Sequence, residues 1–139
     1  PLDGEHDSNH GLTPVMTLNS AVISLRQVAT GEAVGYGQAW IAQRDSLIAT
    51  VAMGYADGYP RHAGTGTPVM VNGQRTTLIG RVSMDMVTVD VTDIKGINVG
   101  SPVCFWGPDL GPNEVARHIG TIGYELITRV GPRLPKIYI

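Results

Sequence analysis

Cysteine is almost absent from this sequence, which contains a single one, Cys104. One thiol excludes a disulfide within the chain and fits a reducing compartment, so we expect a cytoplasmic protein. Cys104 lies in the apolar run 102–106, and free cysteines are commonly buried packing residues. We therefore expect it to pack in the core rather than to act as a nucleophile.

Clusters of basic residues and long apolar runs are also missing. The 10 lysines and arginines are scattered along the chain, and the formal net charge is −2. This balance argues against nucleic acid or an anionic membrane as the main partner. No signal peptide or transmembrane run is visible in the sequence.

Several motifs of common enzymes and metal sites are missing. The sequence has no Walker A loop, no HExxH zinc motif, no paired CxxC and no GxSxG nucleophile elbow. The glycine-rich segment 64–68 lacks the lysine of a phosphate loop and is predicted to be an ordinary loop. His6 and His10 lie near acidic residues, but without a helical apolar face beneath them we expect no metal site.

The polar start of the chain differs from the rest. Residues 1–13 are predicted to form a linker or mobile loop, and residues 14–139 a single domain. A chain of 139 residues is long enough to bury a sizeable core. Because the chain begins at Pro1, we expect it to be a piece of a longer protein.

Turn residues are abundant, with 18 glycines and 9 prolines between short apolar segments. The hairpin signal Asn72-Gly73 is the strongest of these turns. Segments with strand composition span 15–18, 21–25, 34–43, 46–55, 67–71, 76–82, 86–91, 102–106 and 134–139. Short helices are predicted over 113–119 and 123–129. Since strands and helices do not alternate, the predicted fold is mostly β, a small Greek-key-like β-barrel with two short helices near the C-terminus.

The chemically richest segment is the turn from Gly54 to Arg61, which also carries Tyr55, Asp57 and Tyr59. Asp57 followed by glycine is a common turn dipeptide, so we predict a structural role for this carboxylate. A turn does not need Tyr55 or Arg61, and binding residues concentrate on loops of rigid scaffolds. Together with the neighbouring segments 34–37 and 80–86, this turn predicts that one rim of the β domain binds a polar small molecule.

Three further residues are candidates for binding or catalysis. Tyr36 lies between two glycines, which let a ligand approach closely, although an ordinary strand tyrosine is the alternative. Arg81 suits a substrate or partner carboxylate, or else a surface ion pair. Tyr124 lies near the start of the second predicted helix and suits either an anion site or a half-buried surface anchor.

Five motifs in order resemble the C-terminal domain of alanine racemase, the bacterial enzyme that uses pyridoxal 5'-phosphate (PLP). The resemblance runs from about Leu12 to the C-terminus. It rests on segments 14–18, 31–37, 54–61, 80–86 and 123–126. Any one of these motifs alone is weak, but five in order with compatible spacing are specific.

The resemblance implies a role for each candidate residue. Tyr36 matches the tyrosine that serves as one of two catalytic acid/bases and exchanges the α-proton of the L-enantiomer. Met84 matches a residue whose backbone amide helps to hold the substrate carboxylate. Tyr55 matches a tyrosine that narrows the entrance to the active site, and Arg61 and Arg81 match arginines further out along it.

The resemblance also implies a cofactor and partners. In that family PLP is bound by a lysine on an N-terminal (β/α) barrel, and Tyr124 matches a tyrosine that hydrogen-bonds its phosphate. Two subunits form a head-to-tail homodimer, in which Tyr36 and Met84 act in the partner's active site. The reaction interconverts L-alanine and D-alanine, for peptidoglycan precursors or for the use of D-alanine.

The N-terminal barrel and its lysine motif are missing from this sequence. Lys95 and Lys136 are the only lysines, and neither lies in that motif. We therefore expect the isolated chain to be inactive and to bind PLP weakly or not at all. Two alternatives remain: a broad-specificity or serine racemase with the same domain, and a stand-alone β-barrel interaction module. Pocket residues on the N-terminal barrel would distinguish an alanine racemase from a broad-specificity or serine racemase. The length of the intact gene would distinguish a racemase domain from a stand-alone module.

Overall fold

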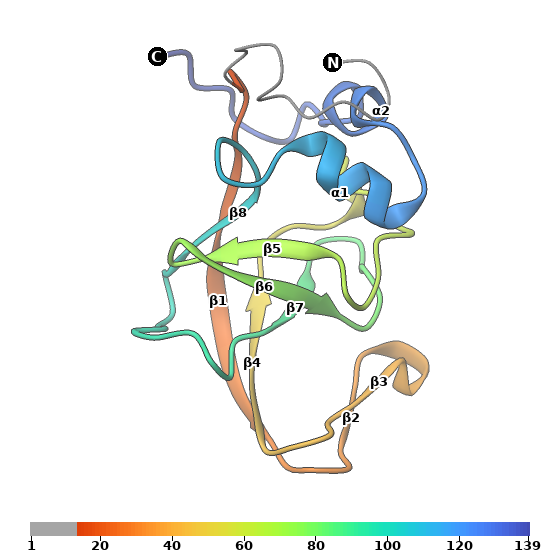
Figure 1. Cartoon of the computed structure of the whole chain (residues 1–139), viewed down its shortest axis with the longest axis vertical. Helices are drawn as coiled ribbons and strands as arrows, with labels where there is room; N and C mark the ends of the chain where they lie inside the picture. The colour runs from red at the N-terminus through yellow and green to blue at the C-terminus, as the bar shows by residue number, and fades with distance from the viewer. Residues whose placement is uncertain (1–13) are drawn as a thin grey trace.

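A closed barrel of six antiparallel strands forms the body of the molecule (Figure 1). The computed structural model describes residues 14–139, and the predicted β-barrel is confirmed within them. Around the barrel the strands follow the order β1, β4, β7, β6, β5, β8. Their bounds are β1 Leu18–Val28, β4 Ser46–Val51, β5 Pro68–Val71, β6 Gln74–Ile79, β7 Val87–Asp90 and β8 Pro102–Trp106.

The long strand β1 joins the two sides of the barrel. Its first part pairs with β8 and its second part with β4, and the register with β4 shifts between Val22 and Ser24. The sequence predicted two separate strands over 15–18 and 21–25, which is wrong, because the polar pair Asn19 and Ser20 lies within the ladder to β8. The predicted strand 102–106 is confirmed as β8, and the other predicted barrel strands are confirmed with at least one shifted end.

The predicted hairpin at Asn72-Gly73 is confirmed between β5 and β6. Asn72 has φ 50° and Gly73 has φ 70°, which are the positive values that a two-residue type I′ turn requires. This turn fixes the register of the hairpin, with Val71 opposite Gln74.

The barrel interior is filled by side chains of valine, leucine and aromatic residues. Tyr59 packs edge-on against Phe105, with ring centroids 4.8 Å apart, and stacks on Trp106 at 6.1 Å. Burial raises the pKa of Tyr59, and its hydroxyl has no hydrogen-bond partner within the described chain. Tyr59 is therefore the core anchor of the turn 54–61, a role that the sequence analysis did not assign to it.

The segment 34–43 was predicted to be one strand, which is wrong. The structure has two short strands, β2 Ala33–Val34 and β3 Trp40–Ile41, joined through the 3₁₀ turn η2 Tyr36–Gln38. Gly35, Gly37 and Gln38 all have positive φ, which a strand cannot accommodate. The resulting small sheet projects from the barrel at the opposite end from the helices (Figure 1).

Both predicted helices are confirmed, as α1 Pro112–Ile119 and α2 Gly123–Thr128. Helix α1 is followed by Gly120 in the left-handed conformation, with φ 75°. The predicted strand over 134–139 is wrong, because this segment has no regular structure and pairs with no strand in the described chain. Its apolar composition is typical of a strand. However, the six strands of the described chain already close the barrel without it.

Two loops that come from different parts of the sequence are interlocked at one rim of the barrel. One of them contains the 3₁₀ turn η3 Tyr55–Asp57. Tyr55 N donates a hydrogen bond to Ser83 O at 3.1 Å, and Ala56 N donates one to Met84 O at 3.0 Å. A Cβ atom on Gly54 would overlap the carbonyl of Met84 and lie 2.5 Å from Asp85 N. Glycine is required at position 54 because the two backbones touch there.

We expect Gly54→Ala to lower the free energy of unfolding by about 2 kcal/mol or more, because the new methyl group forces the loops apart. Gly54 has φ −149°, which alanine adopts without strain, so the cost is purely steric. Gly64→Ala is the matched control, since its Cβ would meet only Gly80 O at 3.7 Å. Urea unfolding of both variants tests this, and equal stabilities would contradict it.

Candidate functional site

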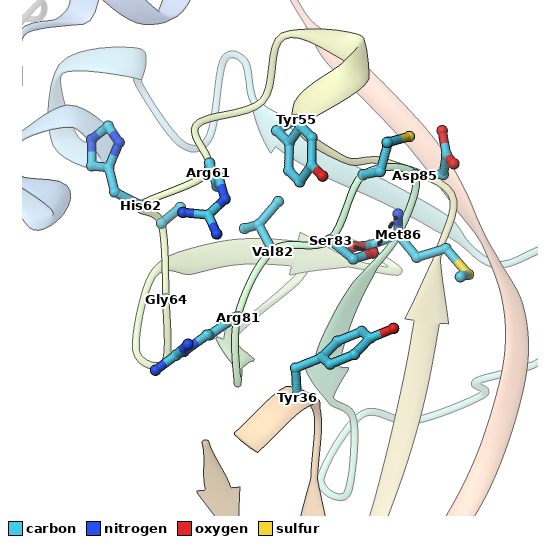
Figure 2. A pocket seen from close by; sticks show the side chains of 12 residues that line it. Tyr36, Tyr55, Arg61, His62, Gly64, Arg81, Val82, Ser83, Asp85 and Met86 are labelled. Carbon is cyan, nitrogen blue, oxygen red and sulfur yellow. Dashed lines mark hydrogen bonds between the residues drawn. The ribbon is translucent and has the colours of Figure 1, made fainter. Parts of the chain in front are cut away.

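A cleft of about 770 Å³ opens at the rim where the two loops meet (Figure 2). Three segments line it, and they are far apart in the sequence. The first carries Tyr36, the second contributes Tyr55 and residues 61–64, and the third contributes residues 81–86. The sequence predicted that these segments form one rim, and the structure confirms that they converge.

Five of the six predicted site residues line this cleft, namely Tyr36, Tyr55, Arg61, Arg81 and Met84. They come from η2, from the turn 54–61 and from the loop 80–86. The interlock at Gly54 joins the turn to the loop, while Tyr36 comes from the small projecting sheet.

Tyr36 is more exposed than the other two non-arginine candidates of the cleft, Tyr55 and Met84. It is 84% exposed, and its ring points toward the loop at Ser83 and Met86 (Figure 2). Its hydroxyl forms no hydrogen bond within the described residues. A phenol placed in this way can donate to or accept from a molecule bound in the cleft.

The loop that carries Met84 is held in a tight bend by its own hydrogen bonds. Ser83 N donates to Met86 O at 3.0 Å, and Met86 N donates to Ser83 Oγ at 3.2 Å. Between these residues, the backbone N–H groups of Met84 and Asp85 have no hydrogen-bond partner within residues 14–139. Adjacent free amides of this kind suit a negatively charged ligand group such as a carboxylate.

The remaining charges of the cleft are mostly basic. Arg61 and Arg81 form no ion pair with any residue that the structure describes, whereas Asp85 is paired with Arg133. The surface ion pair that the sequence offered for Arg81 is therefore not formed. The walls favour an anionic or zwitterionic ligand, because their guanidinium groups are not neutralised.

Asp57 has the structural role that the sequence predicted for it. Its Oδ2 accepts the N–H of Gly54 at 2.9 Å, and the residue is buried. This bond closes the turn and leaves Tyr55 facing the cleft.

His62 lines the cleft although the sequence analysis did not select it. The signal available was its position directly after Arg61, at the end of the turn 54–61.

Tyr124 does not lie in this cleft. It is on α2, where it is 60% exposed rather than half-buried, and Figure 1 places α2 at the opposite end from the small sheet that carries Tyr36. Neither Lys95 nor Lys136 lines the cleft.

Cys104 is less deeply buried than the sequence predicted. Cys104 is only half-buried, and burial raises the pKa of its thiol, so it is a poor nucleophile.

Within residues 14–139 no cluster of three metal-binding side chains occurs, and no helix has the length and hydrophobicity to span a membrane. His6 and His10, and the predicted linker 1–13, lie outside the described residues.

The comparison with known proteins agrees with the motifs. A family model for the alanine racemase C-terminal domain matches residues 15–138. The alanine racemase of Chromohalobacter salexigens is 56% identical over 138 residues, which cover 99% of this chain and 38% of that protein. The biosynthetic alanine racemase of Pseudomonas aeruginosa is also 56% identical over 138 residues, with the same two coverages of 99% and 38%.

Solved structures give the same result. The crystal structure of biosynthetic alanine racemase from Pseudomonas aeruginosa matches with a TM-score of 0.97 at 53% identity, covering 100% of this chain and 39% of that one. Alanine racemase from Bartonella henselae with covalently bound pyridoxal phosphate matches with a TM-score of 0.84 at 34% identity, covering 88% of this chain and 34% of that one. The chain thus spans less than two fifths of the length of these relatives, and it belongs to the alanine racemase C-terminal domain family.

Proposed function

We propose that this chain is the part of an alanine racemase that completes the active site of a second subunit. The observation that supports this most is the convergence of Tyr36 and Met84 on one cleft, where the phenol and the amide both lack partners in the described chain. The whole enzyme interconverts L-alanine and D-alanine with PLP and works as a homodimer.

Tyr36 is the proposed acid/base on the L-side of the substrate. Racemisation needs a proton-transfer group on each face of the α-carbon, and PLP supplies the electron sink that makes this carbon acidic. Tyr36 can approach only one face, and its hydroxyl forms no hydrogen bond with a charged side chain of the described residues. The groups that activate this phenol for proton transfer are proposed to come from outside this chain.

Met84 is proposed to bind the substrate carboxylate through its free backbone N–H. The bend from Ser83 to Met86 presents this amide in a fixed position, which limits the entropy lost on binding. Tyr55 then narrows the entrance, while Arg61 and Arg81 form its outer wall and attract the zwitterionic substrate.

The cofactor is proposed to be held mainly outside this chain. We propose that the described residues do not form a PLP site by themselves, since no lysine lines the cleft and Tyr124 is not among its lining residues. The exposed hydroxyl of Tyr124 suits one hydrogen bond to the cofactor phosphate. The separation of Tyr124 from Tyr36 supports a dimer in which Tyr36 and Met84 serve the partner's site, and Tyr124 its own subunit's cofactor.

The proposed biological setting is supported by the name of one relative. A relative with 56% identity is named as a biosynthetic alanine racemase, which favours the supply of D-alanine for peptidoglycan precursors over its breakdown. We propose that the enzyme is cytoplasmic, where alanine and PLP are available and a free cysteine stays reduced.

In the longer enzyme, we expect Tyr36→Phe to slow exchange of the α-proton of L-alanine by about 10²–10³-fold, because the L-side loses its acid/base. Exchange from D-alanine is expected to fall by less than about tenfold, since its base lies on the other face. Deuterium incorporation from each enantiomer in heavy water measures this. Tyr138→Phe, at a side chain that is 90% exposed, is the control for loss of a hydroxyl. Equal losses for both enantiomers would contradict the assignment.

The isolated chain is expected to have no racemase activity even with added PLP, because it lacks the cofactor lysine of the N-terminal region. Polarimetry with L-alanine, together with the visible absorption spectrum of added PLP, tests activity and binding. The longer enzyme under the same conditions is the positive control. Sustained racemisation by residues 1–139 alone would overturn the proposal.

A further inference from the structure

Arg133 connects the two loops that build the cleft, although it does not line the cleft itself. Its Nη2 lies 2.9 Å from Asp85 Oδ1 on the loop 80–86, and its Nε lies 3.5 Å from Asp57 Oδ1 on the turn 54–61. A single guanidinium therefore bridges carboxylates from both loops. Its planar group with several N–H donors suits this bridge, which a lysine ammonium could not reproduce.

One end of this bridge is fixed. Asp57 is buried and its other oxygen, Oδ2, already accepts the N–H of Gly54 at 2.9 Å. The hydrogen bond to Asp85 and the negative charge of Asp57 both raise the pKa of Arg133, so both carboxylates stabilise its charged form. The other partner is Asp85, whose side chain is 53% exposed and which follows Met84 directly.

The segment that carries Arg133 is itself held against the turn by its backbone. Gly131 N donates to Asp57 O at 2.8 Å. A Cβ on Gly58 would lie 2.8 Å from Gly131 N and would overlap the carbonyl of Arg129, so the two backbones are in direct contact. The backbone before Arg133 is therefore packed against the turn 54–61, and the Arg133 side chain reaches from there to Asp85 on the loop that carries Met84.

We propose that Arg133 is a positioning residue that holds the Met84 loop in the form that binds the substrate carboxylate. This inference rests on the proposed function, in which the Met84 amide binds that carboxylate. Arg133 acts through Asp85 and does not touch the substrate. Losing the bridge frees the loop to move, so the amide is no longer fixed in place before the substrate arrives.

An ordinary surface ion pair provides the matched control. Arg44 pairs with Asp93 at 2.5 Å, and the two side chains are 55% and 76% exposed. Neither residue lines the cleft, and neither pairs with a buried carboxylate. Exposed pairs of this kind contribute little, so Arg44→Gln should be nearly silent.

The first experiment measures kcat and KM for L-alanine and D-alanine in the longer enzyme. We expect Arg133→Gln to raise KM about tenfold for both enantiomers while kcat changes less than about threefold, because carboxylate binding is lost equally before and during proton transfer. Arg133→Lys should raise KM by about threefold, since it keeps the charge but not the bridge. Arg44→Gln should leave KM within about twofold.

The second experiment does not depend on activity. Hydrogen exchange is measured at the amides of Tyr55 and Ala56, which donate to the carbonyls of Ser83 and Met84. We expect Arg133→Gln to speed their exchange about tenfold through more frequent local opening, and Arg44→Gln to leave it unchanged.

The outcomes separate this inference from the proposed function. If the wild-type enzyme racemises alanine but KM is unchanged in Arg133→Gln, the inference is wrong. If the wild-type enzyme does not racemise alanine, the proposed function fails. In that case hydrogen exchange decides on Arg133, and unchanged exchange at the Tyr55 and Ala56 amides in Arg133→Gln would overturn its role as well. Should Arg133→Gln fail to fold, the KM of Arg133→Lys decides, and a value equal to wild type overturns the inference.

Discussion

The contact between the turn at Gly54 and the loop at Met84 is the constraint on which the cleft depends. The two backbones approach so closely that no side chain fits at Gly54, and two hydrogen bonds join them. Tyr59 on the same turn is buried in the barrel core and packs against Phe105, so core packing also holds this wall of the cleft in place. The barrel therefore serves as a rigid support for two loops whose relative position determines what the cleft binds.

The cleft offers a phenol, free backbone amides and unneutralised arginines, but it contains no lysine. Under the proposed function, these groups orient a small zwitterion and move one proton, and the remaining chemistry is supplied from outside this chain. The projecting position of Tyr36 agrees with this division, since a side chain that is 84% exposed in the chain alone is well placed to enter a neighbouring active site.

Local patterns in the sequence predicted the barrel, both helices and the hairpin at Asn72, because hydrophobic spacing and turn residues act over short distances. The motifs also identified five residues that share the cleft. The break at Tyr36 was missed because composition does not reveal that Gln38 joins the neighbouring glycines at positive φ. The bridge from Arg133 was missed because it depends on tertiary contacts between residues 48 positions apart.

The central claim is that Tyr36 of one subunit completes the active site of the other. It is tested by mixing enzyme subunits that carry Tyr36→Phe with subunits that lack the cofactor lysine of the N-terminal region. If Tyr36 acts across the interface, each hybrid dimer has one intact site, and random mixing should restore about a quarter of the wild-type activity. If Tyr36 acts within its own subunit, no hybrid contains an intact site, and activity no higher than that of the unmixed variants would contradict the account.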